Sequence, residues 1–268
     1  MDRILFAITT YNQLEYTKLC IESLKKHTHK IFDILIVDDF SNDGTPDWST
    51  KNNIQTISKR KPEGATSSWN LAYLYFKEHI EYKYFIIASN DILVPDGALT
   101  ELVEVFEKWP FSLVVPMTSV VGAGHNGNTQ GIENVWPGTP SELANEPNNY
   151  QNIQQQILEH KEIIKKQNNL YLLDPVRMKM FNGFFLMMNR YIINYEREDG
   201  NLFNPEKLMY QGEDEFNWAS LIPNNDFPAL CKTAFIFHYK GVSTKGFSTI
   251  RNDRKKWEEL REKNKYGN

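Results

Sequence analysis

The first half of the chain alternates short runs rich in β-branched and aromatic residues with segments whose apolar residues recur at helical spacing. This alternation is typical of βαβ units, in which parallel strands lie side by side and helices cover both faces of the sheet. It predicts strands at residues 3–8, 31–37, 54–57, 85–89 and 112–116, helices at 13–27, 64–80 and 95–109, and a turn at 41–45. We therefore expect an α/β fold with a mainly parallel central sheet.

The second half of the chain is less regular. Residues 122–149 are rich in glycine, asparagine and proline, which predicts a long loop, and residues 151–166 have the composition of a polar helix. Apolar runs at 178–189 and 227–239 predict two more strands, and a short helix is expected near Asp214. We interpret residues 1–249 as a single Rossmann-like domain, followed at 250–268 by a basic helix or tail.

Composition narrows the functional classes. With 268 residues and 41% hydrophobic content, the chain can bury the core of one large domain. The net charge of −4 removes the basic field typical of nucleic-acid binders, which disfavours nucleic acid as a partner without excluding it. Cys20 and Cys231 are expected to be core residues in a reducing compartment. No stretch reaches the ~18 apolar residues of a spanning helix or resembles a secretory signal, so we expect a soluble, cytoplasmic protein; its oligomeric state is not predicted.

Polar clusters follow four of the predicted strands. They are Thr9-Thr10-Tyr11-Asn12, Asp38-Asp39, residues 59–64, and Ser89-Asn90-Asp91. Taken singly, each cluster can be explained as the cap of a helix or turn. Because ligands of open α/β sheets bind at the carboxyl ends of the strands, the four together predict a ligand site at that edge.

Four strings resemble a known family in their order and spacing: ITTYNQLEYTKLCIESL, ILIVDDFSNDGT, FIIASNDILVPDGALTELV and YQGEDEFNWA. They look like a family 2 glycosyltransferase with the GT-A fold, over roughly residues 3–245. The resemblance implies transfer of a sugar, with inversion, from a UDP- or dTDP-sugar to a hydroxyl of a glycan or of a lipid- or protein-linked acceptor. A modified nucleic-acid base is a minor alternative acceptor, favoured only by the basic tail. It also divides the domain into a nucleotide-binding half at 1–121 and an acceptor and catalytic half at 122–249.

The resemblance implies a set of nucleotide contacts. The residues concerned are Thr9, Thr10, Tyr11, Asn12, Asp38, Asp39, Arg60, Gly64, Asn70, Ser89 and Asn90. Asp38 and Asp39 are expected at the pyrimidine base, with Asp39 the stronger candidate, because uracil and thymine offer an N–H donor to a carboxylate. Lys59 or Arg60 is expected either to touch phosphate or to be a solvated surface charge.

A metal site is implied by Asp91. Most GT-A relatives end this strand with Asp-x-Asp, whose last carboxylate holds Mn²⁺ or Mg²⁺, whereas here the first Asp is Ser89. The Asn-Asp string resembles a rhamnosyltransferase-like subgroup written Asn-Asn-Asp. His238 matches a histidine that completes the metal site in relatives, although a histidine beside a strand end is also commonly a hydrogen-bonded structural residue.

The catalytic segment is expected at Glu213 and Asp214. The resemblance implies that Asp214 is the general base and Glu213 its neighbour, while Glu215 begins a helix and is expected to be exposed. Acidic residues also favour a helix N-terminus for purely electrostatic reasons. The resemblance further places Asn182, Gly183 and Trp218 at the donor sugar or acceptor.

Two other functional classes compete with the glycosyltransferase interpretation. A nucleotidyltransferase would need a Gly-rich basic loop after the first strand, which residues 9–12 do not provide. A catalytically degenerate sugar-nucleotide-binding protein fits Ser89 but leaves Asp214 without a purpose. The glycine string at 122–127 is followed by prolines and glycines that oppose the helix a dinucleotide site needs, and His27-Thr28-His29 is expected at the surface.

Overall fold

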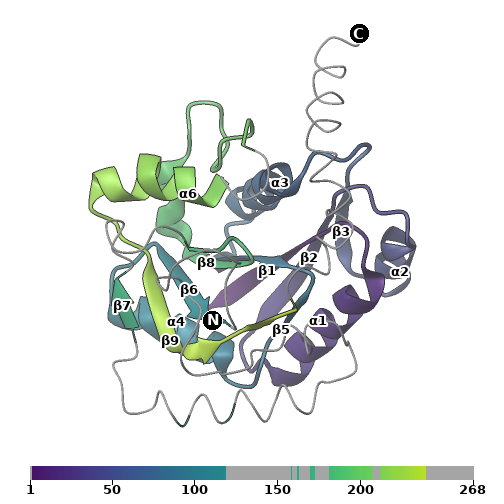
Figure 1. Cartoon of the computed structure of the whole chain (residues 1–268), viewed down its shortest axis with the longest axis horizontal. Coiled ribbons are helices and arrows are strands. Elements are labelled where there is room, and N and C mark those ends of the chain that lie inside the picture. Colours follow the sequence, from purple (N-terminus) through teal and green to yellow (C-terminus); the bar gives the residue numbers. More distant parts are fainter. Residues whose placement is uncertain are drawn as a thin grey trace.

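The computed structural model describes residues 2–118, 158, 162, 170–172, 181–207 and 212–239. An eight-stranded sheet in the order β3-β2-β1-β4-β8-β6-β9-β7 forms its centre (Figure 1). The predicted loop at 122–149, most of the predicted helix at 151–166 and the tail at 250–268 lie outside the described residues. The division of the domain into two halves remains a prediction, although strands from both parts share this one sheet.

The strands confirm the expected α/β class. Their bounds are β1 Arg3–Thr10, β2 Phe32–Asp38, β3 Gln55–Ser58, β4 Tyr82–Ser89, β6 Leu113–Met117, β7 Leu170–Leu172, β8 Phe185–Asn189 and β9 Ala229–Phe235. β1 pairs in parallel with both β2 and β4, β2 with β3, and β6 with β9. β8 runs antiparallel to β4 and β6, and β7 antiparallel to β9. The sheet is therefore mainly parallel, with β8 inserted antiparallel between β4 and β6 and β7 antiparallel at one edge.

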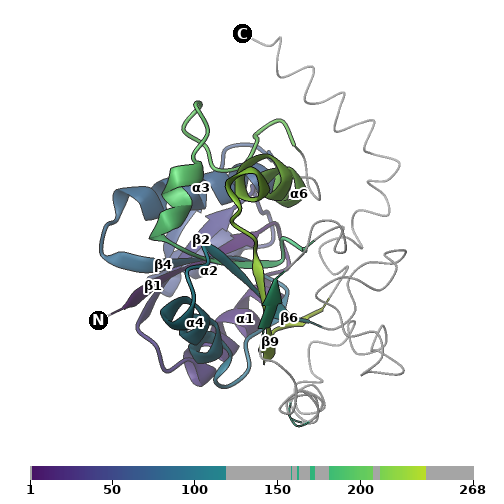
Figure 2. The same cartoon turned by 90° about the vertical axis from the view of Figure 1, so that its left-hand side faces the viewer.

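The helices cover both faces of this sheet. They are α1 Leu14–His27, α2 Thr45–Lys51, α3 Ala65–Glu78, α4 Ala98–Lys108 and α6 Gly212–Phe216, with short helical turns η2 Arg190–Tyr195, η3 Asn217–Leu221 and η4 Ile222–Asn224. Figure 2 shows α1 and α4 on one side of the sheet and α3 and α6 on the other. The expected three-layer arrangement is confirmed.

Strand β1 shows why both faces are apolar. Successive side chains of a strand point to opposite faces, so Leu5 and Ala7 join the core beneath α3, whereas Ile4, Phe6 and Ile8 join the core beneath α1 and α4. All five side chains are essentially inaccessible to solvent. A strand buried on both faces reads as the continuous apolar run seen in the sequence.

Helix α2 was not predicted, because seven residues are too few to show a helical period. Its start is encoded locally: Gly44 has a φ of 90°, Pro46 stands in the first turn, and Asp43 Oδ1 accepts from the Thr45 N–H and hydroxyl at 3.1 and 2.7 Å. The predicted turn at 41–45 is therefore also the start of a helix.

The late strand breaks where the sequence predicted continuity. β9 ends at Phe235, and after Ile236 the chain forms β10 (Phe237–His238), which leaves the main sheet and pairs antiparallel with β5 (Ile92–Leu93). Strand β8 is likewise shorter than the predicted run, since no strand is assigned at 181–184. Among the described residues, no helix has the length and apolar composition needed to cross a bilayer.

Candidate functional site

The predicted clusters lie side by side at the carboxyl ends of the parallel strands. In the register of the sheet, Thr10 lies opposite Asp38, and Thr9 lies opposite Ser89. The ends of β2, β1 and β4 therefore meet in one row, as expected for a ligand site of an open α/β sheet. His238 reaches the same row because β10 pairs with β5, directly after Asp91.

The loop after β1 is held in an unusual backbone conformation. Asn12 and Gln13 have φ values of 60° and 66°, in the left-handed region that is uncommon for residues other than glycine. Asn12 compensates by donating its backbone N–H to Ser41 Oγ at 2.7 Å and accepting from the Asn42 N–H at 2.9 Å. The loops after β1 and β2 are thus tied together, and Tyr11 is left 37% exposed at the edge.

The Asn90 amide forms a buried link across this edge. Its Nδ2 lies within hydrogen-bond distance of Thr10 Oγ1 (3.1 Å), Thr17 Oγ1 (3.0 Å) and the Asn12 carbonyl (3.0 Å). Asn90 is 3% exposed. This geometry favours a role for Asn90 and Thr10 in shaping the loop rather than in touching the nucleotide directly.

Asp39 is the centre of the loop at residues 59–64. Its Oδ1 accepts from Lys59 Nζ at 2.9 Å and from the Glu63 N–H at 2.8 Å, while Oδ2 accepts from the Gly64 N–H at 2.8 Å. The Lys59 side chain is 3% exposed, and burial lowers its pKa although the Asp39 charge opposes the shift. Lys59 therefore serves the loop rather than a phosphate, whereas Arg60 is exposed. Each carboxylate oxygen has two lone pairs, so Oδ2 of Asp39 can accept one further hydrogen bond from a ligand.

Asp38 is buried beside Asp39 but is held differently. Its Oδ2 accepts from the Ser41 N–H at 3.1 Å, and among the described residues its Oδ1 has no hydrogen-bond partner. Burial raises the pKa of Asp38, and the nearby charges of Asp39 and Asp43 act in the same direction. Asp38 thus offers a second buried acceptor close to the expected base position.

Asp91 and His238 are brought together as the sequence predicted. His238 Nε2 lies 3.2 Å from Asp91 Oδ1, and the imidazole stacks on Phe184 with ring centroids 4.8 Å apart. Two neighbouring ligands of an octahedral cation bound at about 2.1 Å lie about 3.0 Å apart, so this separation suits Mg²⁺ or Mn²⁺. In the described ranges no third His, Cys, Asp or Glu joins them. Phosphate oxygens and waters could supply further ligands.

The acidic segment begins helix α6. Glu213 is 3% exposed, and its Oε1 accepts from the Gly183 N–H at 3.2 Å. The backbone of Asp214 lies in α6, but the placement of its side chain is outside what the structure describes. Glu215 was expected to be exposed; instead its Oε1 accepts from Asn204 Nδ2 at 2.7 Å and its Oε2 lies 3.5 Å from Lys207 Nζ.

The remaining predicted residues lie in three kinds of surroundings. Asn70 is buried on α3, where its amide bonds the backbone of Leu202 and Phe203 at 3.2, 2.9 and 2.8 Å, which favours a scaffold role. Trp218, in η3, is 49% exposed and is therefore accessible to an acceptor. The other four lie at the edge and bond locally: Thr9 to the Ala88 carbonyl, the Ser89 N–H to the Phe184 carbonyl, Asn182 Oδ1 to the Phe184 N–H, and Gly64 to Asp39.

Two features near the site were not anticipated. The first is Trp69 of α3, whose indole packs against both Gly183 and Gly212. The second is Phe40, which is 50% exposed with a φ of 70° directly after the two aspartates. The two glycines were the only local signal for the Trp69 packing, and their partner lies far away in the sequence.

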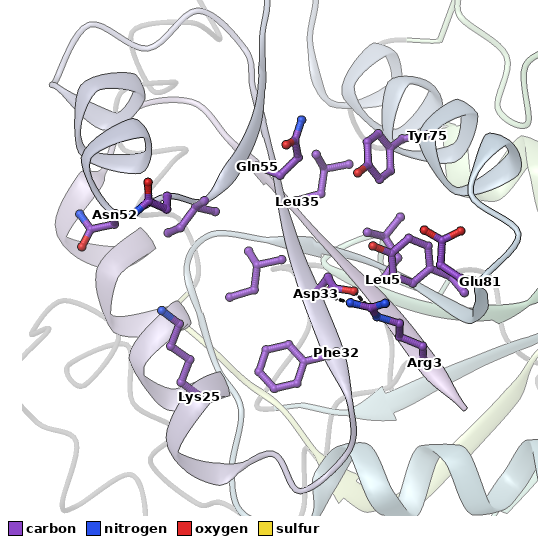
Figure 3. A pocket seen from close by; sticks show the side chains of 14 residues that line it. Arg3, Leu5, Lys25, Phe32, Asp33, Leu35, Asn52, Gln55, Tyr75 and Glu81 are labelled. Carbon is purple, nitrogen blue, oxygen red and sulfur yellow. Dashed lines mark hydrogen bonds and ion pairs between the residues drawn. The ribbon is translucent and has the colours of Figure 1, made fainter. Parts of the chain in front are cut away.

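A separate cavity lies at the opposite edge of the sheet. It has a volume of about 480 Å³ and is lined by residues at the amino ends of the strands, including Arg3, Phe32 and Asp33 (Figure 3). Arg3 and Asp33 satisfy one another as an ion pair inside it. Because the predicted residues converge on the carboxyl edge, this cavity is not the candidate site.

Comparison with known proteins agrees with the motifs. The model of "Glycosyl transferase family 2" matches residues 6–192. The teichoic acid poly(glycerol phosphate) polymerase of Staphylococcus epidermidis is 29% identical over 129 residues, covering 44% of this chain and 17% of that protein.

Solved structures show the same fold at low identity. The S. aureus TarS 1–349 structure matches with a TM-score of 0.58 and 13% identity over 89% of this chain and 60% of that one. GalNAc-T7 with UDP, GalNAc and Mn²⁺ gives 0.60 and 13% over 89% and 44%. The mannosyltransferase PcManGT of Pyrobaculum calidifontis, with GDP-Man and Mn²⁺, gives 0.55 and 11% over 88% and 56%.

The chain spans less than two thirds of each of these relatives. The rhamnosyltransferase-like subgroup remains a prediction. The family model covers most of the chain, and the sheet order and site edge agree with it. The chain therefore belongs to glycosyl transferase family 2 and has the GT-A fold.

Proposed function

We propose that the chain is an inverting glycosyltransferase that moves a sugar from a UDP-sugar, or a dTDP-sugar, to an acceptor hydroxyl. The observation that carries this proposal is the pairing of Asp91 with His238 at 3.2 Å, on the same sheet edge as Asp38 and Asp39. A buried carboxylate and an imidazole from distant strands form a cation site beside buried acceptors suited to a pyrimidine base.

The donor is proposed from the acceptors at the end of β2. Asp39 Oδ2 and the buried Asp38 Oδ1 can each take a donor hydrogen bond, which fits the ring N–H of uracil or thymine. Among the similar structures, TarS was solved with UDP and with UDP-GlcNAc. These complexes favour UDP over dTDP as the nucleotide of the donor. Because PcManGT was solved with GDP-Man, a GDP-sugar is the appropriate control donor.

Asp91 and His238 would hold Mn²⁺ or Mg²⁺ when the nucleotide is present. The bound cation would neutralise the charge of the donor diphosphate as it leaves. Because the chain supplies only two described ligands here, we expect weak cation binding without nucleotide. The second carboxylate of the usual Asp-x-Asp is Ser89 in this chain, which also lowers the negative charge of the free site.

The transfer step is assigned to the segment at α6. The acceptor oxygen attacks the anomeric carbon as the bond from that carbon to the diphosphate oxygen breaks, and Asp214 takes the hydroxyl proton. Glu213 is buried against Gly183 and Glu215 bonds Asn204, so both neighbours of Asp214 are engaged in contacts of their own. Asn182, Gly183 and Trp218 are proposed to line the sugar and acceptor side.

The test is a panel of nucleotide sugars. Thermal shift with UDP-, dTDP- and GDP-sugars, with and without Mn²⁺, identifies the donor, and UDP release then measures hydrolysis or transfer to glycan and poly(glycerol phosphate) acceptors. The proposal expects the largest shift with a pyrimidine donor and a product of inverted anomeric configuration by NMR. Binding without turnover under every condition would instead favour a sugar-nucleotide-binding protein, and a retained configuration would exclude the proposed displacement.

A further inference from the structure

Three segments that are distant in the sequence meet on the indole of Trp69. They are helix α3, which carries Trp69, the turn at Gly183, and the start of α6 at Gly212. A Cβ placed on Gly183 would lie 2.5 Å from Trp69 Cη2, 2.9 Å from its Cζ2 and 3.1 Å from Glu213 Cδ. A Cβ placed on Gly212 would lie 2.9 Å from Thr66 Oγ1 and 3.4 Å from Trp69 Cζ3. The indole therefore fills the space that a side chain at Gly183 would need, whereas at Gly212 the Thr66 side chain takes that space and the indole lies in van der Waals contact.

Neither glycine is required by its backbone conformation. Among the glycines that the structure describes, those with positive φ are Gly44, Gly64, Gly97 and Gly200, and neither Gly183 nor Gly212 is one of them. Glycine is thus present at both positions for close approach rather than for conformational freedom.

The group fixed by this contact is the carboxylate of Glu213. Its Oε1 accepts from the Gly183 N–H at 3.2 Å, and Glu213 is 3% exposed. Trp69 is itself held, since it is 5% exposed and its ring packs edge-on against Phe203 at 5.3 Å. The next residue, Asn70, bonds the backbone on both sides of the Leu202–Phe203 peptide. The surface of α3 facing the site is therefore a rigid support.

We propose that Trp69 is a positioning residue for the acidic segment. By filling the gap between Gly183 and Gly212, the indole holds the Gly183 N–H against Glu213 and sets the start of α6 relative to the turn at 182–184. This inference rests on the proposed function in one respect: α6 is taken to carry Asp214, the proposed general base. The contact itself is independent of that assignment, so the two can fail separately.

The first test is a double-mutant cycle that measures the melting temperatures of variants at Gly183 and Trp69. Gly183→Ala should clash with the indole and lower the melting temperature by several degrees, as overpacked cores usually do. Trp69→Phe removes the two indole atoms nearest to the new methyl group, so Gly183→Ala should cost much less in that background. Equal melting shifts in both backgrounds would overturn the proposed contact. This arm requires no activity.

The second test distinguishes positioning from ordinary core packing. Trp69→Phe should raise the amide exchange rate of a peptide covering 182–184 at least tenfold while leaving peptides of β1 unchanged, because the Gly183 N–H loses its fixed acceptor. Once a donor is found, the same variant should lower kcat about 10- to 100-fold with a change in donor KM below threefold.

Trp48→Phe is the matched control. Trp48 is partly buried and packs on the opposite core, so its variant should leave both the exchange at 182–184 and kcat unchanged. Unchanged exchange and kcat in Trp69→Phe would overturn the inference. Absence of turnover in the wild type with every donor would defeat the proposed function, and the exchange and melting results would then decide the inference alone.

Discussion

The same substitution, Asp→Asn, is expected to have opposite effects on the free energy of unfolding at the adjacent positions Asp38 and Asp39. Asp39→Asn removes the charge that faces Lys59 Nζ at 2.9 Å, and the Lys59 side chain is 3% exposed. Breaking a buried pair by removing one partner typically costs about 3–5 kcal/mol. Asn also retains only one of the two oxygens that accept from Lys59, Glu63 and Gly64. We therefore expect a loss of about 3 kcal/mol in the free energy of unfolding.

Asp38→Asn should behave in the opposite way. Burial raises the pKa of Asp38, which means that its charge is costly in the folded protein. The amide oxygen of Asn can keep the bond from the Ser41 N–H. We expect unfolding free energy to stay the same or to rise by up to about 1 kcal/mol. Urea unfolding of the two variants at neutral pH measures the difference directly.

The pH dependence of the unfolding free energy provides an independent check that Asp39→Asn leaves Lys59 as a buried, unpaired charge. The pKa of Lys59 is lowered in the folded state, so between that pKa and the ordinary value of 10.5 the unfolded chain binds more protons and stability rises with pH. Asp39→Asn removes the negative charge that opposed this shift, so the pKa of Lys59 in the folded state should fall further. The pH range over which stability rises then begins at a lower pH. As pH rises toward 10.5, the variant should therefore recover more stability than the wild type does.

The double variant Asp39→Asn/Lys59→Met closes the test. Removing the stranded ammonium should recover at least half of the Asp39→Asn loss, because a neutral pair of similar volume buries no unpaired charge. Equal losses for Asp38→Asn and Asp39→Asn, or no recovery in the double variant, would refute the argument that Asp39 organises the loop through Lys59.

Three further results are expected. Asp214→Asn should lower turnover by roughly 10²–10⁴-fold with donor affinity nearly unchanged, whereas Glu215→Gln should change turnover less than threefold; loss of activity in the second variant alone would reassign the base. Asp39→Ala should weaken UDP binding by about 1–3 kcal/mol in calorimetry, and unchanged affinity would remove Asp39 from the base site. Phe40→Gly should raise the unfolding free energy by about 0.5–1 kcal/mol, since Phe40 has a φ of 70° and is half exposed; a loss would show that its ring makes a stabilising contact.

The sequence predicted the elements whose signal is local. Strand β1 and helix α3 carry long apolar patterns, and the structure places both within two residues of the expected bounds. Strand β10 has only two residues, and its partner β5 lies far away in the chain, so no periodic pattern in the sequence predicts it. Yet β10 is what delivers His238 to Asp91, a pairing that the resemblance predicted and that periodicity alone did not.

The candidate site shows the same limit at the level of side chains. Asn70 and Asn90 were expected at the nucleotide. The sequence does not reveal whether the hydrogen-bond partner of an amide side chain is a ligand or the protein backbone. In the structure, both amides form hydrogen bonds with backbone groups. Lys59 had two possible roles, and only the fold shows that it is buried on Asp39. Trp69 was missed because its contacts with two distant glycines exist only after folding.

The most direct test of the central claim is calorimetric titration of UDP into the wild-type protein and into Asp91→Asn, with Mn²⁺ and with chelator. If Asp91 and His238 hold a cation together with the donor diphosphate, Mn²⁺ should raise UDP affinity at least tenfold in the wild type, a gain of about 1.4 kcal/mol, and have no effect in Asp91→Asn. Equal UDP affinity with Mn²⁺ and with chelator in the wild type would contradict the proposed metal-assisted nucleotide site.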